Sequence, residues 1–288
     1  MFFKERAERY CNGKIRIDVY PNSELYKDKD EIEALQLGAV QMLAPSFSKF
    51  SPLGIKEFEV IDLPFLFRNK ADLRKVINGP VGRWLLDRLD SKGFVGLAFW
   101  DNGYKIMSAN RLIKTPENMH GLKMRIQPSR VLQIQMQAWG AIPKIMAFKD
   151  VYQALQTGIV DGTENPPSNM YTQKMHEVQK YATLTYHGYL GYVVVVNKTF
   201  WDDLPNNIRA NLEKALTEAS AYANEIAQKE NDDALAAMKK CGKIEFYTPT
   251  PEEMKAWTDT AKTIHANAAE RVGTDLLEEI YKETGVRP

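Results

Sequence analysis

The sequence predicts an α/β fold of two lobes that are joined by a long helix. The chain has 288 residues, which is more than one hydrophobic core usually serves. Helical and strand-like segments alternate along it, which favours a sheet with crossover helices on both faces. Between Pro205 and Lys240 apolar residues recur at three- and four-residue steps. One helix of more than about 45 Å is therefore expected to bridge the two lobes.

Each expected lobe consists of two discontinuous segments. Residues 1–102 with 191–225 are assigned to lobe I, and residues 103–190 with 226–288 to lobe II. The chain would thus cross between the lobes several times before it ends.

Individual elements follow from the period of the apolar residues and from turn residues. Residues 1–10 have helical spacing that Asn12-Gly13 ends, and residues 14–20 alternate like a strand that Pro21-Asn22 closes. The other expected helices are 30–37, 71–89, 129–139, 148–157, 205–240 and a last helical region from 251 to 281. The other expected strands are 41–44, 58–63, 93–100, 104–108, 121–126, 159–164 and 192–196.

The composition argues against several classes of function. Lys and Arg (38) nearly cancel Asp and Glu (37), so the net charge of +1 provides no broad field for nucleic acid. The longest apolar run is far shorter than the roughly 20 residues that cross a bilayer. The four histidines and two cysteines lack the spacing of a metal site. We therefore expect no nucleic acid partner, no membrane span, no bound metal and no cofactor.

Motifs of catalysis are also missing from the sequence. It contains no Gly-x-Gly-x-x-Gly, no phosphate-binding loop and no Gly-x-Ser-x-Gly elbow. The acidic stretch Asp28-Lys29-Asp30-Glu31 lacks the glycine and the final glutamate of a calcium loop. We interpret this stretch as a solvated helix start, where acidic charge is favourable. The chain is therefore predicted to catalyse nothing.

Arg125 is the first candidate for ligand binding. It follows Leu122-Lys123-Met124 in a strand with apolar neighbours, so its guanidinium would be desolvated if it faced inward. Such a charge is costly unless an anion meets it. The planar fork of arginine suits bidentate binding of a carboxylate. An internal salt bridge to one of the chain's own acids remains the alternative.

Asn165 and Ser46 each lie where a predicted strand ends. Asn165 precedes Pro166, and ligands of open α/β sheets lie beyond the carboxyl ends of the strands. The Asn165 amide would share a carboxylate with Arg125, unless it only caps the turn. The loop that carries Ser46 would donate hydrogen bonds to a ligand, and a plain turn role is equally open.

Lys105, Phe148 and His187 are further candidates. Lys105 lies at the expected crossing between the lobes, where binding clefts form, although an ordinary solvated lysine is the simpler interpretation. Phe148, four residues before Tyr152, would supply either an apolar wall or part of the core. His187 is a lone histidine near a strand end, for which a structural role is the alternative.

Five ordered blocks of sequence place these residues in a wider context. They are Gly13 to Leu25, Asp62 to Phe67, Gly121 to Ser129, Met146 to Phe148 with Val151 to Thr157, and Asp161 to Pro167. Together they resemble the solute receptors of tripartite ATP-independent periplasmic (TRAP) transporters, the DctP family, and specifically the branch that binds four-carbon dicarboxylates. The resemblance covers essentially the whole chain.

The resemblance implies a periplasmic-binding-protein-like fold whose two lobes close by a hinge around the ligand. In the family an arginine in the place of Arg125 forms the main salt bridge to a substrate carboxylate, and an asparagine in the place of Asn165 orients it. Many relatives carry arginine where Lys105 stands, so this chain keeps the charge without the fork. Phe148 matches the aromatic wall of the family, and Gln127, in the block around Arg125, is a further binding candidate.

The implied function is that of a receptor that binds succinate, fumarate or malate and delivers it to TRAP membrane subunits. Arg125 would take one carboxylate, and Lys105 with polar loop groups the other. Two alternatives stay open: a receptor that reports its ligand to a signalling kinase, and an enzyme that uses His187 as acid or base. The resemblance also implies a monomer in the periplasm.

The amino terminus departs from the family. Relatives begin with an export signal, followed by a strand and a loop, before the helix that begins here at Met1. No signal peptide is recognisable in this chain. We therefore expect the first strand of lobe I to be missing.

Overall fold

The computed structural model describes residues 1–21 and 23–288. Within those residues, seven strands form one mixed sheet with the order β1-β6-β2-β5-β3-β4, and β7 pairs with β6. The strands are β1 (Met42–Leu43), β2 (Phe94–Ala109), β3 (Lys123–Ile126), β4 (Ile142–Ile145), β5 (Gly162–Asn165), β6 (Tyr181–Asn197) and β7 (Glu245–Tyr247). The sheet is continuous because β2 and β6, which have 16 and 17 residues, pair from end to end.

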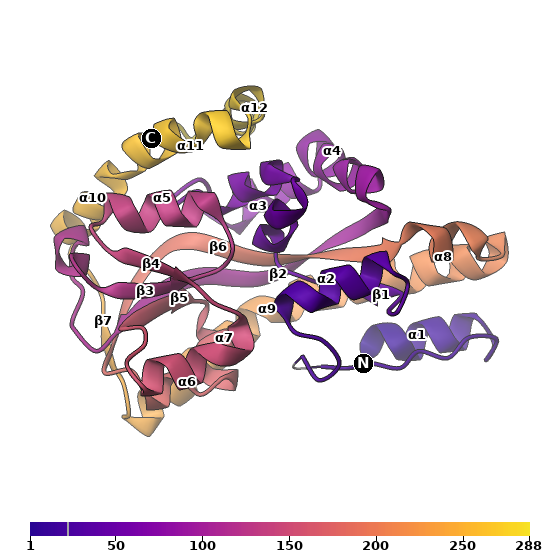
Figure 1. The fold of residues 1–288 in the computed structure, drawn as a ribbon, viewed down its shortest axis with the longest axis horizontal. Coiled ribbons are helices and arrows are strands. Elements are labelled where there is room, and N and C mark those ends of the chain that lie inside the picture. Colours follow the sequence, from indigo (N-terminus) through magenta and orange to yellow (C-terminus); the bar gives the residue numbers. More distant parts are fainter. Residues whose placement is uncertain (22) are drawn as a thin grey trace.

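Helices gather at the two ends of this sheet and define two lobes. The α-helices are α1 (Phe2–Tyr10), α2 (Asp28–Gln36), α3 (Lys70–Ile77), α4 (Pro80–Asp87), α5 (Arg130–Ala138), α6 (Val151–Gln156), α7 (Pro167–Thr172), α8 (Lys198–Asp203), α9 (Asn206–Cys241), α10 (Pro251–Asp259), α11 (Ala261–Val272) and α12 (Thr274–Thr284). Figure 1 shows α5, α6 and α7 around β3, β4 and β5 at one end, and α1, α2, α4 and α8 at the other end. The predicted two-lobed α/β architecture is therefore confirmed, with β2 and β6 shared by both lobes.

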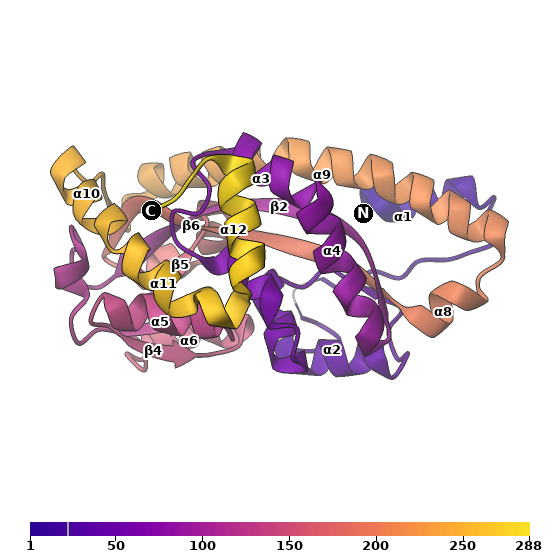
Figure 2. The ribbon, with the colours of Figure 1, turned by 90° about the horizontal axis from the view of Figure 1, so that it is seen from above.

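The predicted bridging helix is α9, which has 36 residues and spans about 54 Å at the usual rise per residue. It packs against α1, β2 and α7, and Figure 2 shows it along the length of the molecule. Asn224 of α9 accepts from the backbone N–H of Asp101 at 2.7 Å, and Asn231 donates to the carbonyl oxygen of Asn102 at 2.8 Å. The helix is therefore bonded to β2 where that strand passes between the lobes.

The helices after α9 contact elements of either lobe. α11 packs against α5 and against the 3-10 helix η2 (Lys56–Asp62), whereas α12 packs against α3 and α4. Arg271 of α11 forms an ion pair with the buried Glu59 of η2, with an Nε–Oε2 distance of 2.8 Å. The assignment of residues 226–288 to lobe II stays a prediction.

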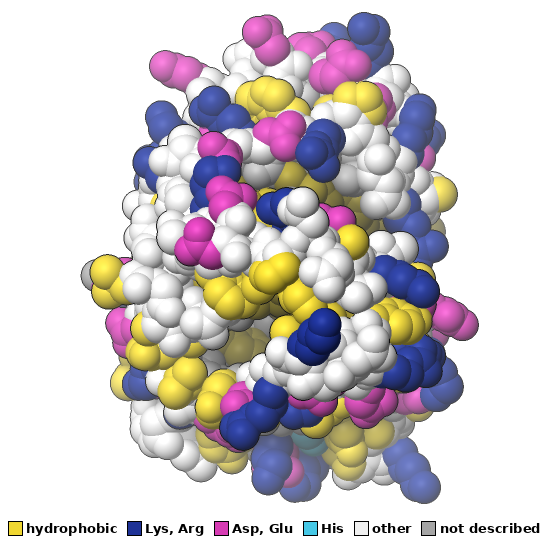
Figure 3. Space-filling view, turned by 90° about the vertical axis from the view of Figure 1, so that its right-hand side faces the viewer, with side chains coloured by type: hydrophobic (Ala, Val, Ile, Leu, Met, Phe, Trp, Pro, Cys, Tyr) yellow, Lys and Arg dark blue, Asp and Glu magenta, His cyan; other side chains and the backbone are white. Residues whose placement is uncertain are grey.

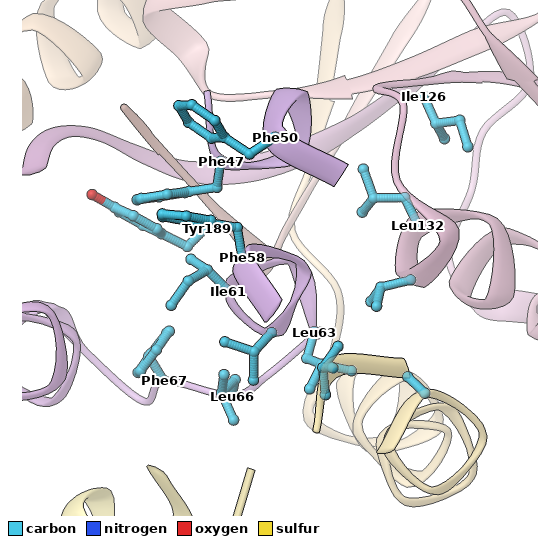
Figure 4. Close-up of a cluster of buried hydrophobic side chains, with 14 of the residues drawn as sticks. Phe47, Phe50, Phe58, Ile61, Leu63, Leu66, Phe67, Ile126, Leu132 and Tyr189 are labelled. Atoms are coloured by element: carbon cyan, nitrogen blue, oxygen red, sulfur yellow. The ribbon is translucent and has the colours of Figure 1, made fainter. Parts of the chain in front are cut away.

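An aromatic cluster fixes the segment between β1 and α3 against the sheet. Phe47 and Phe50 belong to the 3-10 helix η1 (Phe47–Leu53), and their rings lie 6.4 Å and 4.9 Å from the ring of Phe58. Figure 4 shows these rings together with Ile61, Leu63, Leu66, Phe67 and Tyr189. Because a close-packed cluster resists displacement, Ser46 and Asp62, at the ends of η1 and η2, have fixed positions relative to β6.

The predicted strand at residues 14–20 is wrong. These residues are extended, but no strand pairs with them in the part of the chain that the structure describes. The N–H of Ile17 instead donates to Oε1 of Glu8 in α1 at 2.8 Å. Alternation alone predicted the strand, whereas a strand also needs a hydrogen-bonded neighbour. Asn22, in the turn expected at Pro21-Asn22, lies outside the described residues.

The predicted strand at 58–63 is also wrong, because this segment is the 3-10 helix η2. Its residues from Phe58 to Leu63 are all buried, including Glu59 and Asp62. A short apolar run that is buried on every side has no period that distinguishes a strand from a helical segment.

Two other expectations change in detail. The predicted helix 71–89 is divided into α3 and α4 at Gly79-Pro80, because proline has no N–H to continue the first helix. The predicted strands 93–100 and 104–108 are one strand, β2, with an irregular register between Asp101 and Gly103. The predicted parallel pairing holds for β3 with β4 and β5, whereas β1, β6 and β2 pair antiparallel.

One face of the protein carries both signs of charge side by side. Figure 3 shows basic and acidic side chains interspersed over the face that it presents, in line with the net charge of +1. Among the described helices, none combines the length and the apolar character that crossing a bilayer requires.

Candidate functional site

The parallel strands β3 and β5 bring Arg125 and Asn165 to one face of the sheet. Arg125 pairs with Thr163, and residues in register share a face. Asn165 is two residues beyond Thr163 and therefore lies on that face too. Gln127 follows Arg125 by the same interval. The side chains expected to bind a ligand thus meet at the carboxyl ends of two neighbouring strands, where α/β proteins bind ligands.

Arg125 is held in place by the segment that follows β4. Its Nε and Nη2 both donate to the carbonyl oxygen of Met146, at 3.1 and 2.9 Å, and its Cζ lies 5.7 Å from the centre of the Phe148 ring. The residue is only 2% exposed. Burial lowers the pKa of Arg125 to about 10, although Asp28 and Glu164 act in the opposite direction. The guanidinium therefore remains charged at neutral pH.

No ion pair joins Arg125 to a carboxylate among the residues that the structure describes. Nη1 and Nη2 carry further N–H groups, and in this described part of the chain only Met146 accepts from the guanidinium. The internal salt bridge, which the sequence left as an alternative, is therefore not formed with any carboxylate that the structure describes. A desolvated cation without a matching anion fits a site for an anionic ligand.

Asn165 lies at the end of β5 and is 3% exposed. Its Nδ2 donates to Oγ1 of Thr163 at 3.3 Å and lies 3.8 Å from Sδ of Met175. Both contacts come from the second lobe, so the amide is oriented by its own lobe. This position beside Arg125 is compatible with the expected role of orienting a carboxylate.

Polar contacts join the lobes on this side of the sheet. Nε2 of Gln127 donates to Oγ of Ser46 at 2.7 Å. The backbone N–H of Phe148 donates to Oδ2 of Asp28 at 3.0 Å, so the first turn of α2 touches the segment beside Arg125. Both contacts join segments from opposite ends of the sheet on the side where Arg125 lies.

Asp28 corrects the interpretation of the acidic stretch 28–31 as a solvated helix start. Its side chain is 13% exposed, and Oδ1 accepts from Nζ of Lys49 at 2.9 Å. Lys49 also pairs with Glu31 at 2.7 Å. The sequence carried no signal that these acidic residues form ion pairs, because their partner Lys49 comes from a separate segment of the chain.

Lys105 and His187 are not brought beside Arg125. Glu164 pairs with Met107, and Lys105 is two residues before Met107, so Lys105 and Glu164 share a face. Neighbouring residues of a strand alternate in direction, so this face is opposite to that of Thr163 and Arg125. Sequence reasoning could not separate the faces, because it lacked the register between β2 and β5.

On that second face the charges form a closed network. Lys105 Nζ lies 2.7 Å from Oε1 of Glu164, and His187 Nε2 lies 2.8 Å from Oε2. Gln135 of α5 donates to the same oxygen at 2.9 Å, and Thr185 contacts Nδ1 of His187 at 2.6 Å. Burial opposes ionisation of Glu164, yet Lys105 and His187 hold its pKa well below the usual range. Lys105 thus meets a carboxylate of the chain itself.

Asp62 lies near this network and has an unusual environment. It is 3% exposed, and in the described part of the chain its Oδ2 has no hydrogen-bond partner. Burial raises the pKa of Asp62 to about 7, although Lys105 and a hydrogen bond from Ser129 lower it. The proximity of Glu59 and Glu164 adds to the increase.

We expect Asp62→Asn to remove a pH dependence of stability. Since the pKa of Asp62 is higher in the folded protein than the unfolded value of about 3.9, the stability that it contributes is full below about pH 4 and is lost as the pH rises through about 7. The free energy of unfolding of Asp62→Asn should therefore increase relative to wild type between pH 5 and pH 8, as measured by urea denaturation. A difference that is constant over this range would contradict the assignment.

Two grooves on the described surface lie away from Arg125. One, of about 820 Å³, is lined by Trp84 of α4 and by residues around Gly273. The other, of about 310 Å³, lies between α9 and Asn102 of β2. Neither groove is lined by a residue that is expected to bind the ligand.

Comparison with known proteins places the chain in a family. Residues 1–271 match the family described as bacterial extracellular solute-binding protein, family 7, named DctP. The C4-dicarboxylate-binding periplasmic protein DctP of Rhodobacter capsulatus is 58% identical over 282 residues, which cover 98% of this chain and 85% of that protein. The C4-dicarboxylate-binding protein DctB of Bacillus subtilis is 36% identical and covers 97% of this chain and 80% of its own length.

Solved structures agree with that match over nearly the whole chain. A TRAP periplasmic solute-binding protein of Sulfurospirillum deleyianum, with bound succinate, has a TM-score of 0.93 and 42% identity, covering 97% of this chain and 91% of that one. A protein of the same description from Pseudomonas aeruginosa, with bound L-malate, has a TM-score of 0.90 and 39% identity, covering 92% of each chain. The chain therefore belongs to the family 7 bacterial extracellular solute-binding proteins, the DctP family of TRAP receptors.

Proposed function

We propose that this protein is an extracytoplasmic receptor that binds a four-carbon dicarboxylate such as succinate, fumarate or malate and delivers it to a TRAP membrane permease. Arg125 takes one carboxylate of the dianion through the N–H groups that have no acceptor among the described residues. Asn165 orients the same carboxylate, Phe148 forms an apolar wall, and Gln127 and Ser46 line the site from opposite lobes. The protein acts as a monomer in the periplasm.

The observation that carries this proposal is the state of Arg125. Its guanidinium is buried and charged, and in the described part of the chain it forms no ion pair with a carboxylate. Removal of a charge from water costs several kcal/mol unless an opposite charge meets it. A ligand carboxylate would meet that cost and form the bidentate geometry that arginine favours.

The second carboxylate needs a contact other than the one first expected. Lys105 is 1% exposed and already pairs with Glu164. We propose instead that polar groups of the two lobes around Ser46 and Gln127 receive it, because both side chains lie on the side of the sheet where Arg125 lies. Hydrogen bonds to a charged carboxylate are stronger than those between neutral groups.

Catalysis forms no part of the proposal. The rival enzyme would use His187 as acid or base beside Arg125, but both ring nitrogens of His187 are bonded, to Thr185 and Glu164. The strand registers also place His187's partner Glu164 on the face opposite to Arg125. A proton-transfer group must lie within hydrogen-bond reach of the reacting ligand.

Calorimetric titration of the purified protein tests this function. We expect saturable binding of succinate, L-malate or fumarate and no binding of butyrate, which has four carbons but one carboxylate. Samples incubated with L-malate and fumarate should contain unchanged acid, which product analysis would confirm. Absence of binding for all three dicarboxylates would contradict the receptor, equal affinity for butyrate would contradict dicarboxylate recognition, and turnover would favour the enzyme.

A further inference from the structure

The first turn of α2 makes a contact with the opposite lobe that the binding role does not itself require. Oδ2 of Asp28 accepts from the backbone N–H of Phe148 at 3.0 Å, and Oδ1 accepts from Nζ of Lys49 at 2.9 Å. The two oxygens of one carboxylate are therefore divided between the lobes. Hydrogen bonds to an ionised carboxylate are roughly twice as strong as bonds between neutral groups.

The segment that Asp28 contacts is the one that holds Arg125. The carbonyl oxygen of Met146 accepts two hydrogen bonds from the guanidinium, and the ring of Phe148 lies 5.7 Å from Cζ. Only Ala147 separates these two residues in the chain. Displacement of the Phe148 backbone would therefore disturb the support of the guanidinium as well.

We infer that Asp28 is a positioning residue that couples closure of the lobes to the orientation of Arg125 and thereby slows release of the ligand. This inference rests on the proposed function, since it concerns the same site. When the lobes separate, the Phe148 N–H loses its acceptor and the segment around Met146 is free to move. When they close, Asp28 fixes that segment and, through it, the guanidinium.

The charges around Asp28 keep its carboxylate ionised, and one of these charges is the guanidinium of Arg125 itself. Burial opposes ionisation of Asp28, but Lys49, the Phe148 N–H and the charge of Arg125 together outweigh it and keep the pKa of Asp28 below the usual value. Lys49 also balances the negative charge next to the site. Another charged contact between the same two segments, Lys27 with Asp150 at 3.6 Å, is about half exposed on both sides, so it should contribute little.

Rates of succinate release test the inference, measured by stopped flow after mixing with excess L-malate. Asp28→Ala should release succinate about 10- to 100-fold faster, since it removes a hydrogen bond to a charged group, with a nearly unchanged association rate. Asp28→Asn keeps an acceptor for the Phe148 N–H and should release succinate at a rate between those of wild type and Asp28→Ala. Asp30→Asn is the matched control, because Asp30 lies in the same helix and is exposed.

A distance measurement separates failure of this inference from failure of the proposed function. Spin labels at the exposed positions Arg83 and Lys144, in a Cys241→Ser background, report the separation of the lobes without any ligand. Asp28→Ala should shift the distances to longer values, whereas Asp30→Asn should not. If wild type binds succinate and Asp28→Ala releases it at the wild-type rate, the inference is wrong and the receptor stands. If wild type binds none of the acids, the proposed receptor function is wrong. Label distances that coincide in wild type and Asp28→Ala would then overturn the inference as well.

Discussion

Replacement of Arg125 by alanine is expected to weaken succinate binding by roughly 2 to 5 kcal/mol, which corresponds to about a 30- to 5,000-fold increase in Kd. The loss is large because the guanidinium is buried and its remaining N–H groups have no acceptor among the described residues. A ligand carboxylate in the variant would lose its counter-charge in a site that excludes water. Calorimetric titration of wild type and variant measures the difference directly.

Arg125→Lys distinguishes charge from geometry at this position. Lysine keeps the positive charge but not the planar fork, so we expect an affinity between those of wild type and Arg125→Ala. Urea denaturation checks that both variants remain folded, so that a loss of affinity reports on the site itself. Unchanged affinity in a folded Arg125→Ala variant would remove the basis of the proposed site.

Replacement of Lys105 by methionine should act on stability. We expect a decrease of about 3 to 5 kcal/mol in the free energy of unfolding at pH 7, because the variant leaves Glu164 as a buried charge without its closest cation. Lysine and methionine have similar lengths, so the loss of packing is small. Urea denaturation with intrinsic tryptophan fluorescence measures this change.

An exposed ion pair provides the control. Lys229 and Asp233 are 76% and 64% exposed in their side chains, so Lys229→Met should change stability by less than about 1 kcal/mol. The double variant Lys105→Met with Glu164→Gln should recover part of the loss. Equal effects of Lys105→Met and Lys229→Met would show that the buried network contributes no more than a surface pair.

Acidification should reduce the difference in the free energy of unfolding between Lys105→Met and wild type. In wild type the pKa of Glu164 lies well below the unfolded value of about 4.3, so its contribution is present above that value and is lost only in strong acid. Without Lys105 the effect of burial on Glu164 has less opposition, and its pKa rises. As the pH falls toward 5, Glu164 of the variant then becomes protonated, which removes the buried charge and recovers part of the lost stability.

Several elements of the fold could be predicted because their signals are local. The helix from Asn206 to Cys241 has apolar residues at three- and four-residue steps along its 36 residues, and Gly242 ends it in a left-handed conformation. The strand that carries Arg125 has apolar neighbours on both sides. Elements with weak local signals were missed, namely β4, β7, α7 and α8.

Pairing between distant strands decided which candidates meet. Arg125, Asn165, Gln127 and Phe148 come together, and Ser46 reaches Gln127 from the first lobe. By contrast, Lys105 pairs with Glu164 on the other face of the sheet. A shift of one residue in register would exchange the two faces, so no inspection of the individual strands could have assigned them.

By itself the sequence determined the class of fold and the long bridging helix, and it offered Arg125 as a candidate that the family resemblance then supported. The fold class and the helix follow from periodicity, which is a property of short segments, whereas the cost of a buried charge made Arg125 a candidate and left an internal salt bridge open. Only the tertiary structure decided that Asp28 contacts the segment beside Arg125 and that Lys105 is already neutralised. These outcomes depend on contacts between residues 120 and 59 positions apart in the chain, which the register of the sheet and the closure of the lobes create.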